Sequence, residues 1–341
     1  MASEETINPI PKIEGEDDEE IAPQMTHKRC IELPQNLPRD KGWMTEHLVL
    51  YQGFWLTPDS ALKAVISIQN RFYPRPSDIF LASSPKTGTT WLKALIFATL
   101  NRTCYDFSTH PLLVHNPHDC VPLLDTFIHQ NDLESWPSPR FLSTHMPYTL
   151  LPCSMTCASS GCKLVYVCRN PKDVLVSKWK FMNKLRPKHL PPLSLDEAFK
   201  LFCEGVSHYG PYWDHVLGYW KASLENPEKI LFLKYEDLKR EPLEGVKRLA
   251  EFLGKPFLVE EEKAGMVQGI VRLCSFENLR NLEVNKRDVI RFSKDIVVEN
   301  RNFFRKGNVG DSENYLTAEM MQLLDEITKK KFFSSRLIFG A

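Results

Sequence analysis

One short stretch of the chain combines a lysine, a glycine and three threonines directly after an apolar run. It runs from Ser83 to Trp91 and reads SSPKTGTTW. A glycine lets the backbone bend closely around an anion, and the amides at the start of a following helix point at that anion. Lys86 adds a positive charge, and three hydroxyls add hydrogen-bond donors: Thr87, Thr89 and Thr90. The stretch therefore predicts a phosphate-binding loop that turns at Gly88.

This loop departs from the Walker A pattern, in which a lysine comes directly after the second glycine. Here Lys86 precedes Gly88. Taken alone, the loop also leaves open an ordinary strand–turn–helix junction with a capping threonine. The choice between the two depends on other segments of the chain.

A second cationic position follows another apolar run. Arg169 comes directly after that run, and Asn170 and Pro171 then open a helical stretch, because proline suits the first turn of a helix. The planar guanidinium of Arg169 could hold a phosphate through two hydrogen bonds. Ser177 lies about two helical turns after Pro171 on the same helix. The alternative for Arg169 is a surface ion pair with a nearby acid.

The elements that must position these residues alternate along the chain. Three apolar runs have the character of strands buried on both faces: Asp78–Ser83, Cys162–Cys168 and Lys229–Tyr235. A helical stretch follows each run: Thr90 to about Asn101, Asn170 through Phe181, and Glu236 to about Leu253. Alternation of strands and helices predicts an α/β fold. We expect a single domain with a central parallel β-sheet flanked by helices, and a P-loop-like phosphate-binding loop after the first core strand.

Composition narrows the class of protein. The chain has 341 residues, 43% of them hydrophobic, and its 43 Lys and Arg balance 43 Asp and Glu. A net charge of zero gives no reason to expect nucleic-acid or membrane attraction over the whole surface. An anion site must therefore be local. No apolar run is long enough to cross a bilayer, and the acidic N-terminus does not resemble a secretory signal, so we expect a cytoplasmic location.

We expect two parts along the chain. Residues 1–36 are acidic and contain few aromatics, which predicts a disordered N-terminal tail, and residues 37–341 form one domain. The nine cysteines have no paired C-x-x-C spacing, so we expect neither a disulfide framework nor a metal site. Cys162 and Cys168 flank an apolar run, which favours small buried side chains.

Three segments together resemble one family, the cytosolic PAPS-dependent sulfotransferases (the sulfotransferase domain 1 family). PAPS is 3′-phosphoadenosine 5′-phosphosulfate. Ser83–Trp91 resembles the family's 5′-phosphosulfate loop, Cys168–Trp179 its 3′-phosphate segment, and Phe303–Asp311 its C-terminal nucleotide loop. The segments occur in the family's order. Asn116–Pro122 (NPHDCVP) and Ser275–Lys286 (SFENLRNLEVNK) look most like the plant branch.

The resemblance implies transfer of a sulfuryl group from PAPS to a hydroxyl of a small organic acceptor, with adenosine 3′,5′-bisphosphate (PAP) as the second product and no metal. Lys86 would stabilise the leaving phosphate, and Thr87, Gly88, Thr89 and Thr90 would bind the phosphosulfate. Trp91 and Phe276 would stack on the adenine, and Tyr235 would reach its edge. The implied 3′-phosphate site consists of Arg169, Ser177, Arg305, Lys306 and Gly307.

His145 matches the family's catalytic histidine. A neutral imidazole near its ordinary pKa can take the proton of an acceptor hydroxyl as that hydroxyl attacks sulfur. The chain has ten histidines, so a histidine without this motif context would be read as structural. Only the resemblance makes His145 a candidate general base.

The residues of the acceptor pocket are harder to identify from the sequence. The family places a residue equivalent to Phe181 in the acceptor site, and further candidates are Tyr148, Tyr51, Phe54 and Trp55. Packing in the core is the alternative for each of these aromatics. Flavonoid, steroid or brassinosteroid, hydroxyjasmonate and desulfoglucosinolate acceptors all remain open, all of them compounds of plant secondary metabolism.

The chain departs from the family in its dimer segment. In animal relatives this motif opens with Lys, carries Thr-Val and closes with Glu, whereas here Glu313, Thr317-Ala318 and Gln322 stand at those places. We therefore expect a monomer. Three other functions stay open at this point: a small-molecule kinase with a phosphate loop, a nucleotide-binding protein without chemistry, and a membrane-bound sulfotransferase.

Overall fold

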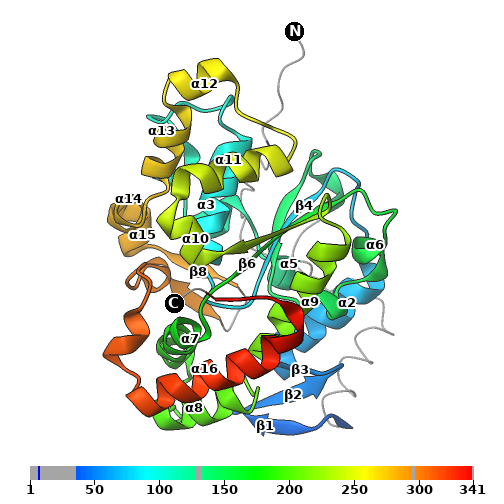
Figure 1. The fold of residues 1–341 in the computed structure, drawn as a ribbon, viewed down its shortest axis with the longest axis vertical. Helices are drawn as coiled ribbons and strands as arrows, with labels where there is room; N and C mark the ends of the chain where they lie inside the picture. Colours follow the sequence, from blue (N-terminus) through cyan, green and yellow to red (C-terminus); the bar gives the residue numbers. More distant parts are fainter. Residues whose placement is uncertain (1–6, 8–35, 128–132, 293–295, 340–341) are drawn as a thin grey trace.

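A four-stranded parallel sheet forms the centre of the molecule (Figure 1). The computed structural model describes residues 7, 36–127, 133–292 and 296–339. The strands lie in the order β5-β4-β6-β7, with bounds Phe141–Thr144 (β5), Ile79–Ser83 (β4), Lys163–Cys168 (β6) and Ile230–Lys234 (β7). The predicted central parallel sheet is thereby confirmed.

Both faces of this sheet are covered because successive side chains of each strand point to opposite sides. Ile79 and Leu81 of β4 join a core with helices from one side, and Phe80 and Ala82 join the core on the other. The first layer contains α3 (Thr89–Leu100), α11 (Pro242–Phe252) and α13 (Met266–Leu273). The second contains α2 (Lys63–Arg71), α7 (Pro171–Leu185), α9 (Tyr212–Glu225) and α16 (Ala318–Phe332).

The three predicted strand–helix pairs are present, with one correction. The stretch predicted as one helix after β7 is two helices, α10 (Tyr235–Arg240) and α11. Glu241 separates them with φ −129° and ψ 64°, outside the helical range. Pro242 follows it, has no N–H to donate and disfavours a helical residue before it. The fourth strand, β5, escaped prediction because it is short and ends in Ser143 and Thr144.

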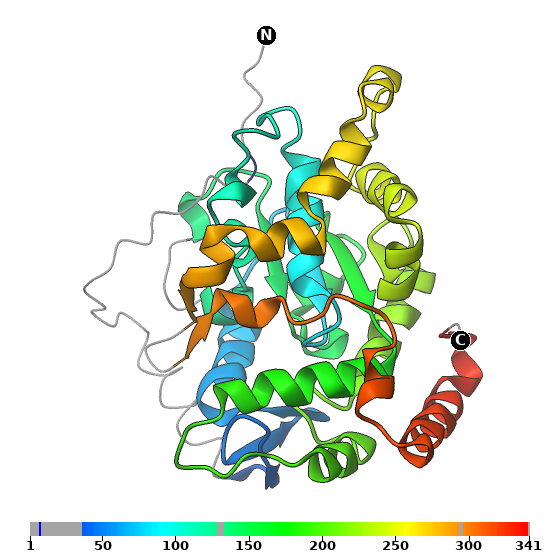
Figure 2. The same cartoon turned by 90° about the vertical axis from the view of Figure 1, so that its left-hand side faces the viewer.

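The remaining elements lie around this core. Two small antiparallel sheets are β1 (Arg39–Lys41) with β2 (His47–Tyr51) and β3 (Phe54–Leu56), and β8 (Val289–Arg291) with β9 (Val297–Glu299). The other α-helices are α4 (Pro117–Cys120), α5 (Leu124–Phe127), α6 (Cys153–Thr156), α8 (Leu195–Cys203), α12 (Val259–Lys263), α14 (Phe276–Asn281) and α15 (Glu283–Arg287). Figure 2 shows the orange segment from Asn300 to Asn314 crossing between α3 in cyan and α7 in green.

The predicted tail, residues 1–36, lies outside the described residues except at two positions. One of these, Ile7, is buried, and its N–H donates to Asn101 Oδ1 at 2.8 Å. Within the described ranges, no helix is long and apolar enough to cross a membrane. No group of three or more His, Cys, Asp or Glu side chains there could hold a metal ion. Cys162 and Cys168 are buried, as expected.

Candidate active site

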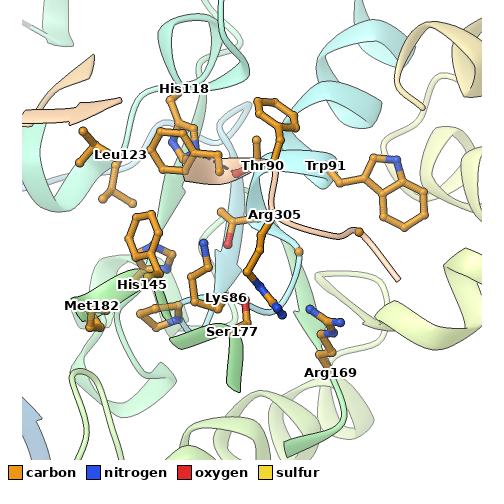
Figure 3. Close-up of a pocket in the computed structure, with 18 of the residues that line it drawn as sticks. Lys86, Thr90, Trp91, His118, Leu123, His145, Arg169, Ser177, Met182 and Arg305 are labelled. Atoms are coloured by element: carbon orange, nitrogen blue, oxygen red, sulfur yellow. Dashed lines mark hydrogen bonds between the residues drawn. The ribbon is translucent and has the colours of Figure 1, made fainter. Parts of the chain in front are cut away.

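A pocket of about 420 Å³ opens at the carboxyl ends of the parallel strands (Figure 3). The ends of β4, β5, β6 and β7 contribute to it through the residues that follow them, together with α7 and the C-terminal segment. This volume suits a small-molecule site. The pocket brings together 14 of the 16 predicted site residues: Lys86, Gly88, Thr89, Thr90, Trp91, His145, Arg169, Ser177, Phe181, Tyr235, Phe276, Arg305, Lys306 and Gly307.

The loop after β4 is shaped to receive an anion. Lys86 has φ 77° and Gly88 has φ 115°, both in the left-handed region, which a lysine adopts only where its surroundings impose it. A Cβ on Gly88 would come within 2.7 Å of the Tyr235 ring, so only glycine fits. Helix α3 begins at Thr89 with no side-chain cap. Its first amides are therefore available to an anion, and the alternative of a capping threonine is wrong.

The hydroxyl of Thr87 does not face the anion site, which corrects one expectation. Thr87 is fully buried, and its Oγ1 donates to the carbonyl of Ser84 at 2.9 Å and lies 3.0 Å from the carbonyl of Val167. The side chain thus ties the loop to β6. Thr89 is also held within the loop, because its Oγ1 lies 2.7 Å from Ser83 Oγ.

Lys86 lines the pocket and contacts an aromatic ring there. Its Nζ lies 3.7 Å from the centre of the Phe181 ring, in a cation–π contact. Burial, followed by the charges of Arg305 and Arg169, lowers the pKa of Lys86 from 10.5 to about 7. An ammonium held among other cations has a strong electrostatic preference for an anion.

Helix α7 and the C-terminal segment meet at Asp173. This buried carboxylate accepts Arg169 Nη2 at 2.9 Å and the backbone amides of Gly310 and Ser312, each at 2.9 Å. Arg169 Nη2 also donates to the carbonyl of Asn308 at 2.6 Å. Asp173 therefore holds the C-terminal nucleotide segment against the helix that carries Ser177. Sequence reasoning missed this role, although Asp173 lies inside the quoted motif.

Two unpartnered arginine nitrogens could receive a second anion. The Nε atoms of Arg169 and Arg305 are buried without a hydrogen-bond partner among the described residues. Buried donors of this kind are rare in proteins and call for a ligand. Ser177 is mostly buried and lines the same pocket. Lys306 is exposed at its rim.

An aromatic slot lies beside these cations. The Trp91 and Tyr235 rings meet edge to face at 5.5 Å, and Phe276 reaches the slot next to Gly307. A Cβ on Gly307 would come within 2.3 Å of the Phe276 ring. The Tyr235 hydroxyl donates to the carbonyl of Gly307 at 3.1 Å. The slot can hold a planar heterocycle between two anion sites.

His145 follows β5 and presents one ring nitrogen to the pocket. Its Nδ1 lies 2.8 Å from the carbonyl oxygen of Ser83. A carbonyl can only accept, so Nδ1 carries the proton and Nε2 keeps its lone pair. Burial lowers the pKa of His145 to about 3, which corrects the expectation of an ordinary pKa. The imidazole is therefore neutral across the physiological range, so the Nε2 lone pair is free, and the same burial makes it a weaker base than a free imidazole.

A carboxylate beside His145 was not anticipated from the sequence. Asp125 is buried, and it accepts the His145 backbone N–H at 3.2 Å and the Tyr209 hydroxyl at 2.6 Å. Burial raises the pKa of Asp125, while the Tyr209 hydroxyl lowers it. Asp125 thus fixes the turn that carries His145. No sequence pattern pointed to it, because it approaches from a separate helix, α5.

Apolar side chains line part of the pocket. Its wall includes Met44, Phe181, Met182, Leu185, Phe292 and Phe303. Tyr148 is not part of it, which corrects a prediction: the 3₁₀ turn after Pro147 directs this ring against Tyr219, with centroids 5.4 Å apart. Tyr51, Phe54 and Trp55 lie in or against the core instead. His118, which also lines the pocket, was quoted within a motif but given no role.

Comparison with known proteins gives consistent results. Residues 76–336 match the family model described as the sulfotransferase domain. The chain is 48% identical to cytosolic sulfotransferase 17 of Arabidopsis thaliana, covering 91% of this chain and 90% of the relative. It is 47% identical to flavonol 4′-sulfotransferase of Flaveria chlorifolia, covering 87% and 91%. A mouse sulfotransferase solved with PAP has a TM-score of 0.63 at 27% identity, covering 84% of this chain and 95% of that one.

Proposed function

The chain belongs to the sulfotransferase family, and we propose that it transfers the sulfuryl group of PAPS to a hydroxyl of a flat aromatic acceptor of the flavonol kind. The chain is a PAPS-dependent sulfotransferase that acts on a small hydroxylated acceptor. The observation that carries the proposal is one pocket lined by Lys86, Arg169 and Arg305, by His145 with its free Nε2 lone pair, and by the rings of Phe181 and Phe303.

The residues fit PAPS at each of its parts. The uncapped start of α3 and Lys86 suit the 5′-phosphosulfate, and the unpartnered Nε atoms of Arg169 and Arg305 suit the 3′-phosphate. Trp91, Tyr235 and Phe276 suit the adenine. When bound, PAPS supplies the sulfuryl group that is transferred. These cations can balance its charge without a metal ion.

The chemistry asked of the protein is positioning, proton transfer and charge stabilisation. His145 Nε2 accepts the proton of the acceptor hydroxyl, which makes its oxygen a better nucleophile. The carbonyl of Ser83 holds the imidazole in one tautomer, and Asp125 fixes the backbone turn that carries it. Lys86 and the first amides of α3 stabilise the negative charge that develops on the leaving phosphate.

The apolar wall favours a planar acceptor. Phe181 and Phe303 can pack against a ring, and their centroids are 5.7 Å apart. The relative named as a flavonol 4′-sulfotransferase supports this class. Steroid, hydroxyjasmonate and desulfoglucosinolate acceptors are the alternatives. The word cytosolic in relatives' names supports a cytosolic location, and the family assignment disfavours the kinase and the binding protein without chemistry.

The test is a panel of acceptors incubated with PAPS and read by mass. We expect a mass gain of one sulfuryl group on flavonols. Adenosine 5′-phosphosulfate, which lacks the 3′-phosphate, is the matched donor control and should react far more slowly. Sulfation of another acceptor class in preference to every flavonol would refute the acceptor proposal. Transfer from neither donor to any acceptor would refute the activity.

A further inference from the structure

A fully buried lysine lies directly behind the phosphate-binding loop and has no part in the chemistry described above. Lys93 is on α3, one helical turn after Thr90, and its side chain is completely shielded from solvent. Its Nζ lies 2.9 Å from His118 Nδ1 and donates to the carbonyl of Val121 at 2.7 Å. Burying an amine in this way is costly, so its two contacts need an explanation.

His118 connects this lysine to the loop. The imidazole bridges two groups, with Nδ1 at Lys93 and Nε2 3.0 Å from Thr90 Oγ1. Asn116 caps α4 and accepts the backbone N–H of His118 at 2.9 Å, which fixes the start of that helix. Figure 3 shows Thr90 in the view between His118 and Trp91, at the wall of the pocket.

The chain of hydrogen bonds has a direction. An ammonium can only donate, so His118 Nδ1 accepts from Lys93. A neutral imidazole has one acceptor and one donor, so Nε2–H donates to Thr90 Oγ1. Burial keeps His118 neutral by lowering its pKa well below the ordinary value. Burial also lowers the pKa of Lys93 to about 7, while the charges of Asp119 and Asp125 raise it. The direction described here is that of the ammonium form, which donates to both partners.

These hydrogen bonds affect the orientation of the Thr90 hydroxyl. Because its oxygen accepts from His118, its own hydrogen remains to be donated. No other hydrogen bond of Thr90 Oγ1 is formed among the described residues, and Thr90 lines the pocket. We propose that Lys93 and His118 are positioning residues that turn the Thr90 hydroxyl outward as a donor to the 5′-anion of the nucleotide. This inference rests on the proposed function, since it deepens the same site.

His118 also touches the C-terminal nucleotide segment. Its ring lies 4.2 Å from that of Phe303, at an interplanar angle of 31°. Phe303 lies two positions before Arg305, which faces the other anion site. The His118 imidazole is thus held between α3 on one side and Phe303 on the other. The alternative to be tested is that His118 only fills space.

The test compares binding of PAP with binding of adenosine 3′-monophosphate, which lacks the 5′-phosphate. Thr90→Val should weaken PAP binding roughly 10- to 100-fold, as expected for a lost hydrogen bond to a charged group. His118→Leu should weaken it roughly 3- to 10-fold. The double variant should bind PAP no more weakly than Thr90→Val, because both changes remove the same contact. All three should bind adenosine 3′-monophosphate as the unchanged protein does, in calorimetry or displacement.

Two further variants separate positioning from packing. His118→Gln should recover most of the affinity, because a glutamine amide can donate to Thr90 in place of Nε2. Lys93→Met keeps His118 in place and should lose PAP affinity without losing affinity for the monophosphate. Lys178→Met is the matched control. Lys178 is equally buried, but it contacts Ser207 and the carbonyl of His208 instead, so the ratio of the two affinities should not change.

The outcomes are distinguishable. Unchanged PAP binding in folded His118→Leu and Lys93→Met would overturn the inference. An equal loss for both nucleotides would also overturn it, because the residues would then support the pocket in general. Failure of the unchanged protein to bind PAP at all would overturn the proposed function instead.

Discussion

At the scale of single residues, the pocket contains ionisable groups whose charge is set by their surroundings. Burial lowers the pKa of both His145, to about 3, and Lys86, to about 7. The first shift keeps a base in its neutral form. The second leaves a cation that an anionic ligand can stabilise. Each shift leads to a measurable prediction.

Replacing His145 by alanine should abolish turnover while leaving the nucleotide bound. The lone pair of Nε2 faces the acceptor side, and general bases contribute typically ~10²–10⁴-fold in rate. Steady-state turnover and PAP affinity by calorimetry check this. His110→Ala is the matched control, since His110 is buried outside the pocket. Its turnover per folded molecule should persist. Near-normal turnover of His145→Ala would show that His145 is structural.

PAP affinity should fall as the pH rises above about 7. The pKa of Lys86 is about 7 without ligand, and a bound anion raises it. Affinity is then greatest below pH 7, where Lys86 is already protonated. Above it, binding must take up a proton, so affinity falls by up to about tenfold per pH unit until the pKa of the complex is reached.

The control for this prediction is Lys86→Met, which has no proton to gain. Its PAP affinity should be weaker and should decline less steeply above pH 7. Calorimetry in buffers of different ionisation enthalpy would also detect the proton taken up by the unchanged protein. Parallel pH profiles for the two proteins would contradict the assignment to Lys86.

At the scale of elements, α7 and the C-terminal segment depend on one carboxylate. Asp173 accepts two backbone amides and pairs with Arg169. Asp173→Asn removes the charge, and hydrogen bonds to charged groups contribute about 1.5–3 kcal/mol. We expect the amides of Gly310 and Ser312 to exchange hydrogen roughly 10- to 100-fold faster, and PAP affinity to fall.

A neighbouring aspartate provides the comparison. Asp325 on α16 pairs with Lys172 of α7 at 2.8 Å, but its side chain is 60% exposed. Exposed ion pairs contribute little. Asp325→Asn should therefore change neither the exchange of the C-terminal segment nor PAP affinity. If both variants behaved alike, Asp173 would not be the anchor.

At the scale of the whole molecule, we predict a monomer at micromolar concentration. In the segment that forms a small dimer contact in animal relatives, Glu313 reverses the charge of the opening Lys, Gln322 removes that of the closing Glu, and Ala318 replaces Val. All three are exposed. A small contact cannot overcome the lost translational and rotational freedom without those Lys, Glu and Val side chains. Sedimentation equilibrium should give a mass near 39.4 kDa. A mass near twice that value would contradict the prediction.

Much of the architecture could be predicted from sequence alone. The apolar runs that precede Lys86 and Arg169 indicated strands buried on both faces, and these became β4 and β6. Local chemistry sufficed there, because a buried parallel strand must be apolar throughout. The same requirement explains why a short, partly polar strand was not predicted. Strand β5 has only four residues and two of them are polar, so its burial depends on its neighbours.

The sequence by itself determined the anion-binding loop and the position of Arg169, since these depend on residue types at close spacing, and the resemblance to the sulfotransferases added His145 and Arg305. Only the tertiary structure decided which side chains meet. Asp125, Asp173 and His118 bond to partners on other elements, and Tyr148 and the Thr87 hydroxyl turn away from the pocket. The physical reason is that orientation and burial come from long-range packing, which also lowers the pKa of Lys86 and His145.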